Sequence, residues 1–382
     1  MSERPTLIID GHLDMAFNAL FYRRDLTQPV TVLRDREDVI PANVSAHPDS
    51  LERREGPWGS RTTTATVTLP EMRKGSVGIM LSTIMARVQV GGAGTSLSLS
   101  NSARTQSIAY AQGQSHLAYY RALERRGEIT FIRSTEDLNA SVKAWDDPKP
   151  DTPVGLILSM ESADPILTPD DVQTWFDAGL RSVSLTHFGA NSYGHGTGTV
   201  GGMYPPAFPL MDALKAAGIA LDVSHLADTA LWQVMEYWDG PVHASHCNCR
   251  ALVPGQRHLT DEMIKAICDR GGVIGSVFCE QMLNPAWDWD DPSTHYDVSK
   301  RPMRAVVDHM DHICQLTGSS DHIAIGSDLD GGFGREHSPT DYNTIADLQR
   351  FLDILRGRGY EEEDVRKIAH GNLVRFFEEA WS

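Results

Sequence analysis

The amino-acid sequence predicts an α/β fold, a (β/α)8 barrel of the TIM type. Eight short apolar segments alternate along the chain with segments of helical pattern, and most of the apolar segments end at an ionisable side chain. Short, unbroken apolar runs are typical of parallel strands buried on both faces. A doubly wound open sheet gives the same alternation. The ionisable residues favour the barrel, because barrel active sites are built at the carboxyl ends of the strands.

The expected strands are short and bounded by polar or glycine-containing segments. They are 7–10, 76–84, 154–160, 181–186, 219–224, 242–245, 272–278 and 323–327. The expected helices are 106–126, 210–217, 228–237, 260–270, 301–316, 340–356 and 364–380. Gly218 is a suitable residue to end the second of these helices. Thr260 is a suitable N-cap, with Asp261 and Glu262 in the first turn of the helix that follows.

Two regions in the N-terminal half interrupt the alternation. Residues 30–67 are polar, charged and contain proline, and residues 89–105 are rich in glycine and serine. We interpret both as loops inserted into the barrel, near one of its faces. Long loops in a compact domain are often functional. The whole chain, 1–382, is expected to form a single barrel domain.

Composition excludes several classes of protein. The 382 residues carry a formal net charge of −17, which argues against binding to nucleic acid or to an anionic membrane surface. Five cysteines are too few, and odd in number, for a disulfide framework. No segment approaches the roughly 20 apolar residues of a membrane-spanning helix, and the first residues lack the apolar stretch of a signal peptide. We therefore expect a cytoplasmic protein.

The ends of the expected strands carry the residues that predict the chemistry. An isolated histidine in such a place is usually hydrogen-bonded, and a histidine and an aspartate two positions apart merely share a face of a strand. The joint pattern is what indicates a site. The residues at or just after the strand ends are His12, Asp14, Glu161, His187, His225, His246 and Asp328.

Histidine nitrogens and carboxylate oxygens are the ligands of open catalytic zinc sites. Five such ligands are too many for one catalytic zinc, but they suit two metals that share a carboxylate. Two metals about 3.5–4 Å apart can lower the pKa of a bridging water to about 7. Glu161 is the natural bridge because a carboxylate has two oxygens. The donor types also admit manganese, cobalt or iron.

The chain resembles the membrane dipeptidase (renal dipeptidase) family, zinc peptidases that hydrolyse dipeptides. The matching segments run across most of the chain in the order of the family. They are IIDGHLD at 8–14, LILSMES at 156–162, SLTH at 184–187, LDVSH at 221–225, ASHCNCRALVPGQRHLTDEMI at 244–264 and IAIGSDLDGG at 323–332. The spacing of eleven residues between His246 and Arg257 also fits. The resemblance implies an amidohydrolase-like barrel, two Zn2+ ions, a small dipeptide substrate and a homodimer.

The resemblance also implies a role for each residue. His12 and Asp14 bind one metal, His225 and His246 bind the other, and Glu161 bridges them.

The other three residues act on the substrate. His187 polarises the scissile carbonyl, Arg257 pairs with the terminal carboxylate, and Asp328 carries a proton from the bridging water to the leaving amine. These roles agree with what amide hydrolysis needs, which is donors at the developing oxyanion and a proton for the amine. From the residues alone, Arg257 would more often be a surface arginine in a polar loop, and it is the family spacing that favours the substrate role. Asp330 is an alternative to Asp328.

The sequence departs from the family after Glu161, where Ser162 and Ala163 replace two glycines that many members carry. Two other functions are considered. A different amidohydrolase-type enzyme, acting on another amide or a lactone, would usually open with HxH and often bridge its metals through lysine, whereas this chain has HLD and Glu161. A catalytically silent barrel would show damage among the ligands or at Asp328, and none is visible. The preference for L,L or L,D dipeptides depends on loops that the sequence does not define.

Overall fold

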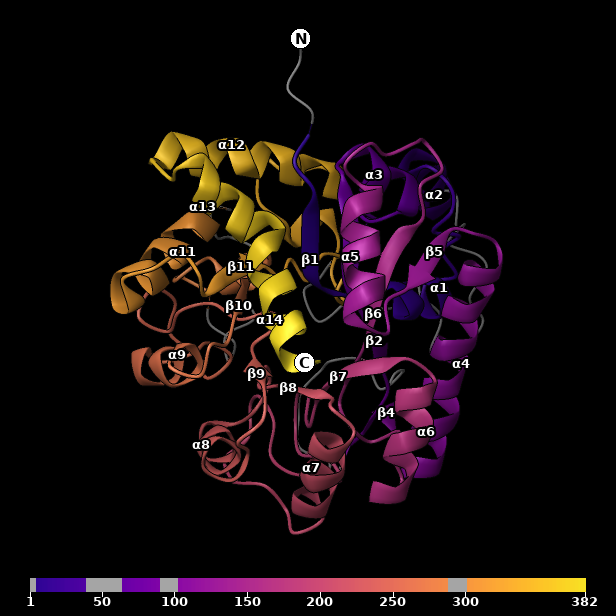
Figure 1. Cartoon of the computed structure of the whole chain (residues 1–382), viewed down its shortest axis with the longest axis vertical. Helices are drawn as coiled ribbons and strands as arrows, with labels where there is room; N and C mark the ends of the chain where they lie inside the picture. Colours follow the sequence, from indigo (N-terminus) through magenta and orange to yellow (C-terminus); the bar gives the residue numbers. More distant parts are fainter. Residues whose placement is uncertain (1–4, 39–63, 90–101, 288–300) are drawn as a thin grey trace.

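The computed structural model describes residues 5–38, 64–89, 102–287 and 301–382 (Figure 1). Eight parallel strands form the barrel in the order in which they occur in the chain. They are β1 (Ile8–Leu13), β2 (Val77–Met85), β6 (Val154–Glu161), β7 (Leu180–Ser184), β8 (Ala220–Asp222), β9 (Val242–His243), β10 (Ile274–Ser276) and β11 (Ile323–Ile325). β11 pairs with β1, and a parallel bridge between Ala244 and Ile274 joins β9 to β10. The predicted barrel is confirmed, and all eight expected strands are present.

The register of the strands brings their carboxyl ends together. β2 and β6 pair without interruption from Ile79 and Gly155 to Met85 and Glu161, so Glu161 lies at the end of the ladder. A short strand that the sequence did not predict, β5 (Ile129–Phe131), pairs with the first residues of β6. Further along the same edge, β6 pairs with β7 as far as Glu161.

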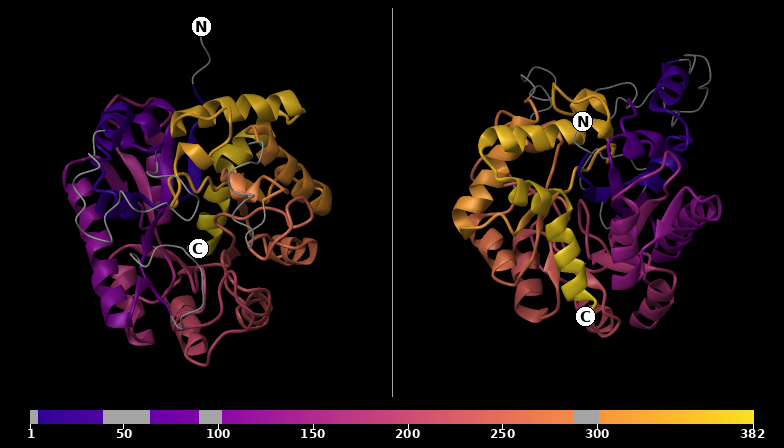
Figure 2. Two further views of the ribbon diagram at one scale, coloured as in Figure 1. Left: turned by 180° about the vertical axis from the view of Figure 1, so that it is seen from behind. Right: turned by 45° about the horizontal axis from the view of Figure 1, so that its top comes forward.

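Helices surround the strands, as two further views show (Figure 2). The N-cap predicted at Thr260 is confirmed, because its side chain accepts from the backbone N–H of Met263. Gly218 follows its helix with a φ of +72°, a conformation that glycine adopts at little cost. Within the described residues, no helix has the length and apolar composition needed to cross a membrane. The helices are α1 (Met15–Phe21), α2 (Val30–Asp38), α3 (Leu69–Lys74), α4 (Gln106–Arg125), α5 (Thr135–Ala144), α6 (Val172–Asp177), α7 (Ala207–Ala216), α8 (Asp228–Tyr237), α9 (Asp261–Cys268), α11 (Arg304–Thr317), α12 (Leu348–Arg358), α13 (Glu362–Arg366) and α14 (Asn372–Ala380).

Several predicted boundaries were wrong. The helix predicted over 340–356 begins later, because Thr344 and Asp347 form a capping box that starts a helical turn leading into α12. The loop predicted over 30–67 contains α2, which buries Val30 and Leu33. The loop predicted over 89–105 contains β4 (Ser102–Ala103), which pairs with β3 (Arg87–Val88). The remainder of these two loops, 39–63 and 90–101, lies outside the described residues.

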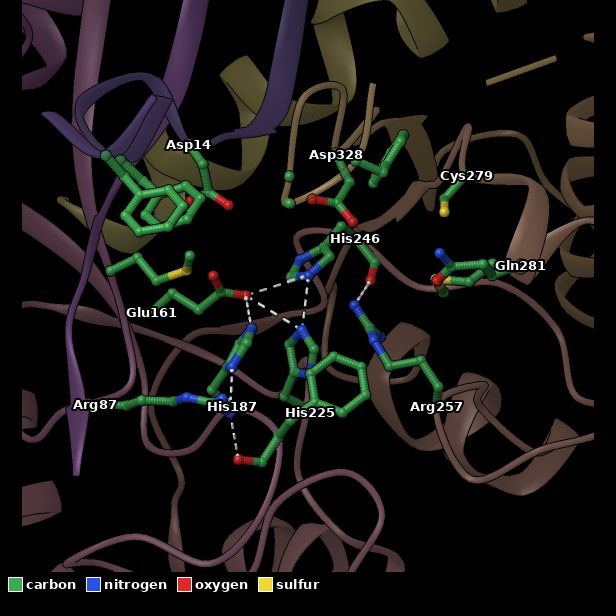
Figure 3. A pocket seen from close by; sticks show the side chains of 18 of the residues that line it. Asp14, Arg87, Glu161, His187, His225, His246, Arg257, Cys279, Gln281 and Asp328 are labelled. Carbon is green, nitrogen blue, oxygen red and sulfur yellow. Dashed lines mark hydrogen bonds and ion pairs between the residues drawn. The ribbon is translucent and has the colours of Figure 1, made fainter. Parts of the chain in front are cut away.

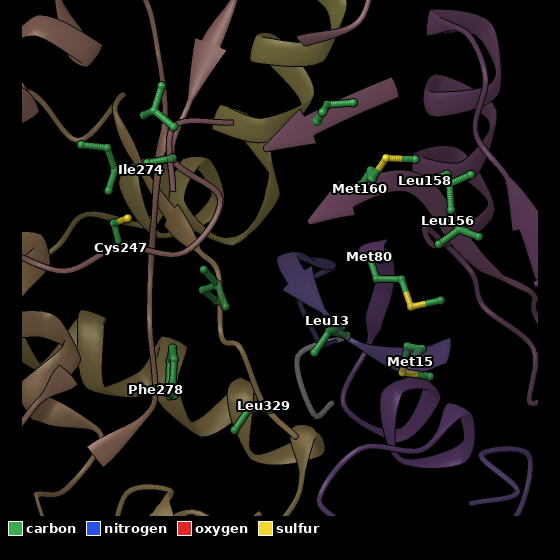
Figure 4. Close-up of a cluster of buried hydrophobic side chains, with 14 of the residues drawn as sticks. Leu13, Met15, Met80, Leu156, Leu158, Met160, Cys247, Ile274, Phe278 and Leu329 are labelled. Atoms are coloured by element: carbon green, nitrogen blue, oxygen red, sulfur yellow. The ribbon is translucent and has the colours of Figure 1, made fainter. Parts of the chain in front are cut away.

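The hydrophobic core closes one end of the barrel and leaves the other to the site. The largest cluster of buried side chains includes Leu13, Met80 and Leu158 from the strands (Figure 4). A second cluster joins the early strand residues, among them Ile9 and Ile79, to aromatic residues of α14. This last helix crosses the amino-terminal end of the barrel in Figure 1. The predicted site residues lie at the opposite, carboxyl end.

Candidate active site

The structure brings all seven predicted strand-end residues together, with Arg257, at the carboxyl end of the barrel. His12 lies within β1, Asp14 immediately precedes α1, and Glu161 is the last residue of β6. The other four strand-end residues follow β7, β8, β9 and β11. Figure 3 shows these side chains, with the exception of His12, converging on one pocket from both sides.

Glu161 lies at the centre of the cluster. Its Oε1 is 3.2 Å from Nε2 of His225, 3.4 Å from Nε2 of His246, and 3.7 Å from Nε2 of both His12 and His187. The Nε2 atoms of His225 and His246 are 3.1 Å apart. Four imidazoles thus face one carboxylate.

Two of the site residues have strained backbones. His225 and Asp328 have φ values of +64° and +57°, in the left-handed region that costs a non-glycine residue about 1–3 kcal/mol. Ser162 is also left-handed, at +74°, which explains why glycine suits this position in the family. Here the Ser162 hydroxyl donates to Asp164 Oδ2 at 2.7 Å and accepts from Asn191.

In the protein without metal, burial disfavours the charged forms of the carboxyl and imidazole groups of the site. Burial, reinforced by the negative charges of Asp14 and Asp328, raises the pKa of Glu161 well above its usual range. Burial also raises the pKa of Asp14 to about 6 and that of Asp328 well above its usual value. In the same pocket, burial lowers the pKa of His225 and His246 well below the usual value. Neutral histidines beside crowded carboxyl groups are the arrangement that a divalent cation stabilises.

The far sides of three imidazoles are held by hydroxyl groups. Ser245 Oγ donates to Asp222 Oδ2 at 2.5 Å and lies 3.2 Å from His12 Nδ1 and 2.8 Å from His246 Nδ1. Because its only proton goes to Asp222, the Ser245 oxygen accepts from both rings. Thr197 Oγ1 lies 3.1 Å from His225 Nδ1. It also donates to the backbone carbonyl of His225, so it too can accept from the ring.

These bonds favour the tautomer with the proton on Nδ1 and a lone pair on Nε2 in all three rings. The Nε2 atoms of His225 and His246 then face each other with no proton between them, and the buried Nε2 of His12 has no hydrogen-bond partner among the described residues. Three unprotonated nitrogens around a carboxylate fit a metal centre. His12, Asp14 and Glu161 also satisfy the distances of a metal-binding group.

Proximity alone does not separate ligands from the other site residues. The same distances group His187 with Glu161 and His225, and group Asp328 with His12 and His246. Asp328 and Asp330, the two candidates that the sequence left open for the proton carrier, are now distinguishable by their surroundings. Asp330 is buried and accepts from the backbone N–H groups of Thr66 and Val67, which gives it a structural role.

All three residues assigned to the substrate, His187, Arg257 and Asp328, line the pocket. Asp328 lies in its wall, with its side chain 16% exposed. Arg257 is buried, not on the surface, and donates to the backbone carbonyl of His246 at 2.8 Å. Its Nη1 lies 3.3 Å from Cys247 Sγ. Cys247 and Cys249 both lie in the hydrophobic core.

Three residues at the site were missed by the sequence analysis. Asp222 and Ser245 lie three and one positions before His225 and His246, and a signal was present. Each interrupts an apolar strand with a polar side chain. Arg87 gave no signal, because its two-residue strand is too short to show a pattern. Its Nη1 lies 3.1 Å from His187 Nδ1 and donates to the carbonyl of Phe188 at 2.7 Å.

The rest of the pocket wall is largely apolar. Three aromatic residues on or just after α1, Phe17, Phe21 and Tyr22, contribute rings whose centroids are 5.0–5.6 Å apart. Met85 and Phe333 also line it. A polar floor with apolar walls is typical of sites for small molecules.

Comparison with known proteins agrees with this geometry. The model of the membrane dipeptidase family, peptidase family M19, matches residues 4–381. An uncharacterised Klebsiella pneumoniae protein from the pqqA 5′ region is 32% identical over 55% of this chain and 76% of its own length. The dipeptidase tcpJ of Claviceps purpurea is 26% identical, over 53% of this chain and 45% of its own length.

Two solved structures share the fold over nearly the whole chain. One is a metallopeptidase described as dipeptidase AC, with a TM-score of 0.74 and 21% identity, covering 99% of both chains. The other is a Rhodobacter sphaeroides metallopeptidase liganded with a phosphinate mimic of the dipeptide L-Ala-D-Ala. Its TM-score is 0.74 at 22% identity, covering 99% of this chain and 100% of the other.

Proposed function

The chain belongs to the membrane dipeptidase family, peptidase family M19, and is a metal-dependent dipeptidase. On this premise we propose that it hydrolyses the amide bond of dipeptides at a centre of two zinc ions, through a hydroxide that bridges them. The observation that carries the proposal is the set of three histidine Nε2 atoms, from His12, His225 and His246, that lie 3.2–3.7 Å from Oε1 of Glu161. His12 and Asp14 would hold one ion, His225 and His246 the other, and Glu161 both.

Bound at these residues, two zinc ions would supply Lewis acidity and lower the pKa of a water shared between them. The chain's own residues do the rest. His187 donates toward the carbonyl oxygen, where negative charge develops. Asp328, whose pKa is raised by burial, takes a proton from the attacking water and passes it to the departing amine nitrogen. The apolar rings of α1 exclude bulk water from this exchange.

Ser245 supports the proposed centre through its hydroxyl, which contacts one ligand of each metal. Replacing Ser245 by alanine should weaken the binding of both zinc ions by about 10- to 100-fold, because the rings of His12 and His246 lose the group that fixes their tautomers. Competition with a chromophoric chelator measures both affinities. Ser276→Ala removes another buried barrel hydroxyl and should leave them unchanged. Loss of one ion alone would contradict the shared role.

Arg257 is proposed to grip the substrate's terminal carboxylate. The guanidinium group of Arg257 is oriented by its hydrogen bond to the carbonyl of His246. A planar guanidinium binds a carboxylate through two parallel hydrogen bonds. Arg257→Lys should raise KM by about 10- to 100-fold, the equivalent of one to two charge-assisted hydrogen bonds, with a smaller change in kcat. Steady-state kinetics on a dipeptide and its C-terminal amide check this.

The amide supplies the decisive comparison for Arg257. The wild-type enzyme should prefer the free acid, and the variant should lose that preference. Arg250→Lys is the control, since Arg250 lies in the same loop but binds Asp228. An unchanged preference in Arg257→Lys would refute the assignment.

A hydrolysis screen tests the proposed function itself. The Rhodobacter relative holds a mimic of an L,D dipeptide, so L-Ala-D-Ala should be assayed beside L-Ala-L-Ala. Release of free alanine from either, dependent on added zinc, supports the proposal. Cleavage of lactones or other amides in place of dipeptides would instead support the amidohydrolase alternative. Absence of any hydrolysis by zinc-loaded protein would support a silent barrel.

A further inference from the structure

Arg87 makes a contact that distinguishes His187 from the other histidines of the pocket. We propose that Arg87 is a positioning residue that fixes the ring tautomer of His187, so that His187 donates from Nε2 and does not ligate a metal. The inference rests on the proposed function, because the acceptor of that hydrogen bond is the carbonyl oxygen of the scissile amide.

The chemistry of the contact determines the tautomer. Arg87 Nη1 lies 3.1 Å from His187 Nδ1, and a guanidinium has hydrogen-bond donors but no acceptor. Nδ1 must therefore accept, and the single proton of the neutral ring resides on Nε2. Nε2–H then faces the centre of the site, 3.7 Å from Glu161.

The other three histidines have the opposite arrangement. Their Nδ1 atoms face Ser245 or Thr197, hydroxyl groups that can accept a hydrogen bond from the ring, which favours a lone pair on Nε2. A ring that carries its proton on Nε2 cannot bind a metal through that atom. One arginine thus separates His187 from the ligands, although its distances to Glu161 and His225 suit a metal-binding group.

Arg87 is held rigidly enough for this role. It is 2% exposed, donates to the carbonyl of Phe188 at 2.7 Å, and donates from Nε to Ser102 Oγ at 3.2 Å. Its strand β3 pairs with β4 at Ser102. The adjacent N–H of Val88 donates to the buried Asp164 at 2.8 Å. The β3–β4 pair, which reaches into the region interpreted as an inserted loop, therefore delivers the arginine to the site.

Two variants and one spectrum test the inference. In Arg87→Met, kcat should fall by about 100-fold, as for loss of an oriented oxyanion donor, while KM changes by less than about threefold and two zinc ions remain bound. Added guanidinium ion should restore part of kcat. In 15N-histidine spectra of the zinc-loaded wild-type protein, His187 should show a protonated Nε2 and an unprotonated Nδ1, its signals being identified by their absence in His187→Gln. Arg87→Met should lose this pattern.

The control is Arg181→Met, which removes another buried arginine that donates to backbone carbonyls, from β7. It should lower stability and leave kcat and the His187 signals unchanged. An unchanged kcat in Arg87→Met, a loss of zinc parallel to the loss of activity, or a protonated Nδ1 in the wild-type spectrum would each overturn the inference. If the chain bound zinc but cleaved no dipeptide, the proposed function would fail while the spectrum still decided the tautomer.

Discussion

Replacing Glu161 by glutamine is expected to reduce dipeptide hydrolysis by more than about 100-fold and to reduce the bound metal below two ions. Mutating a residue that only hydrogen-bonds to a metal ligand already lowers metal affinity or activity by about 10- to 100-fold. Glu161 is proposed to bind both ions directly, so a larger effect is expected. Its Oε1 lies within 3.7 Å of four histidine nitrogens, so no other residue can replace it. Elemental analysis with steady-state kinetics measures both effects.

The same substitution should stabilise the metal-free protein, in a pH-dependent way. The pKa of Glu161 is raised by burial, so the folded protein retains a proton that the unfolded chain releases above about pH 4.3. The free energy of unfolding therefore falls as the pH rises from that value toward the raised pKa. Glutamine does not titrate. Metal-free Glu161→Gln should melt at a higher temperature than metal-free wild type at pH 8, and at a similar temperature near pH 4.

A matched control shows whether these effects belong to the site. Glu128→Gln removes a partly buried glutamate that pairs with Arg73 just before β5. It should leave metal content and kcat unchanged and should not stabilise the metal-free protein at pH 8. If Glu161→Gln kept two ions and full activity, Glu161 could not be the shared ligand.

Replacing Asp328 by asparagine is expected to lower kcat by about 10²- to 10⁴-fold while both ions stay bound, because the variant cannot move a proton. Asparagine is nearly isosteric with aspartate, and both tolerate the left-handed backbone, here at a φ of +57°. The loss should therefore reflect chemistry and not folding. Kinetics on a dipeptide, with metal analysis of the same sample, check the prediction.

Asp330 provides the control for Asp328, two residues away and also left-handed, at +60°. Asp330→Asn disturbs a carboxylate that holds Thr66 and Val67 and should lower stability without a comparable change in kcat. If Asp328→Asn lost metal in proportion to its activity, Asp328 would be a ligand and not a proton carrier. A kcat within a few-fold of wild type would exclude both roles.

The barrel could be predicted because the sequence patterns that specify its strands are local. Each strand is a short apolar run, and most of the predicted strand-end residues follow one directly, so the carboxyl-end rule alone placed Glu161 and His246 in the same site. Thr260 and Gly218 marked helix ends through their own chemistry. α2 was missed because its apolar residues are confined to its first four positions and the rest of the helix is charged, so no helical period is visible.

The supporting contacts were harder to predict because they are long-range. Arg87 meets a histidine 100 positions away, and Ser245 meets one 233 positions away. Neither separation has a periodic pattern in the sequence. Asp222 could have been suspected as a buried carboxylate in an apolar strand, but only the folded barrel shows that its partner is Ser245. The sequence thus identified the candidate ligands, and the structure identified the groups that orient them.

Metal content measured together with activity tests the central proposal most directly. Protein purified without chelator, then stripped and titrated with zinc, should regain dipeptide hydrolysis as the content rises toward two equivalents per chain. Full activity at one equivalent would contradict the two-metal centre. Failure to bind any metal after reconstitution would contradict the proposed mechanism as a whole.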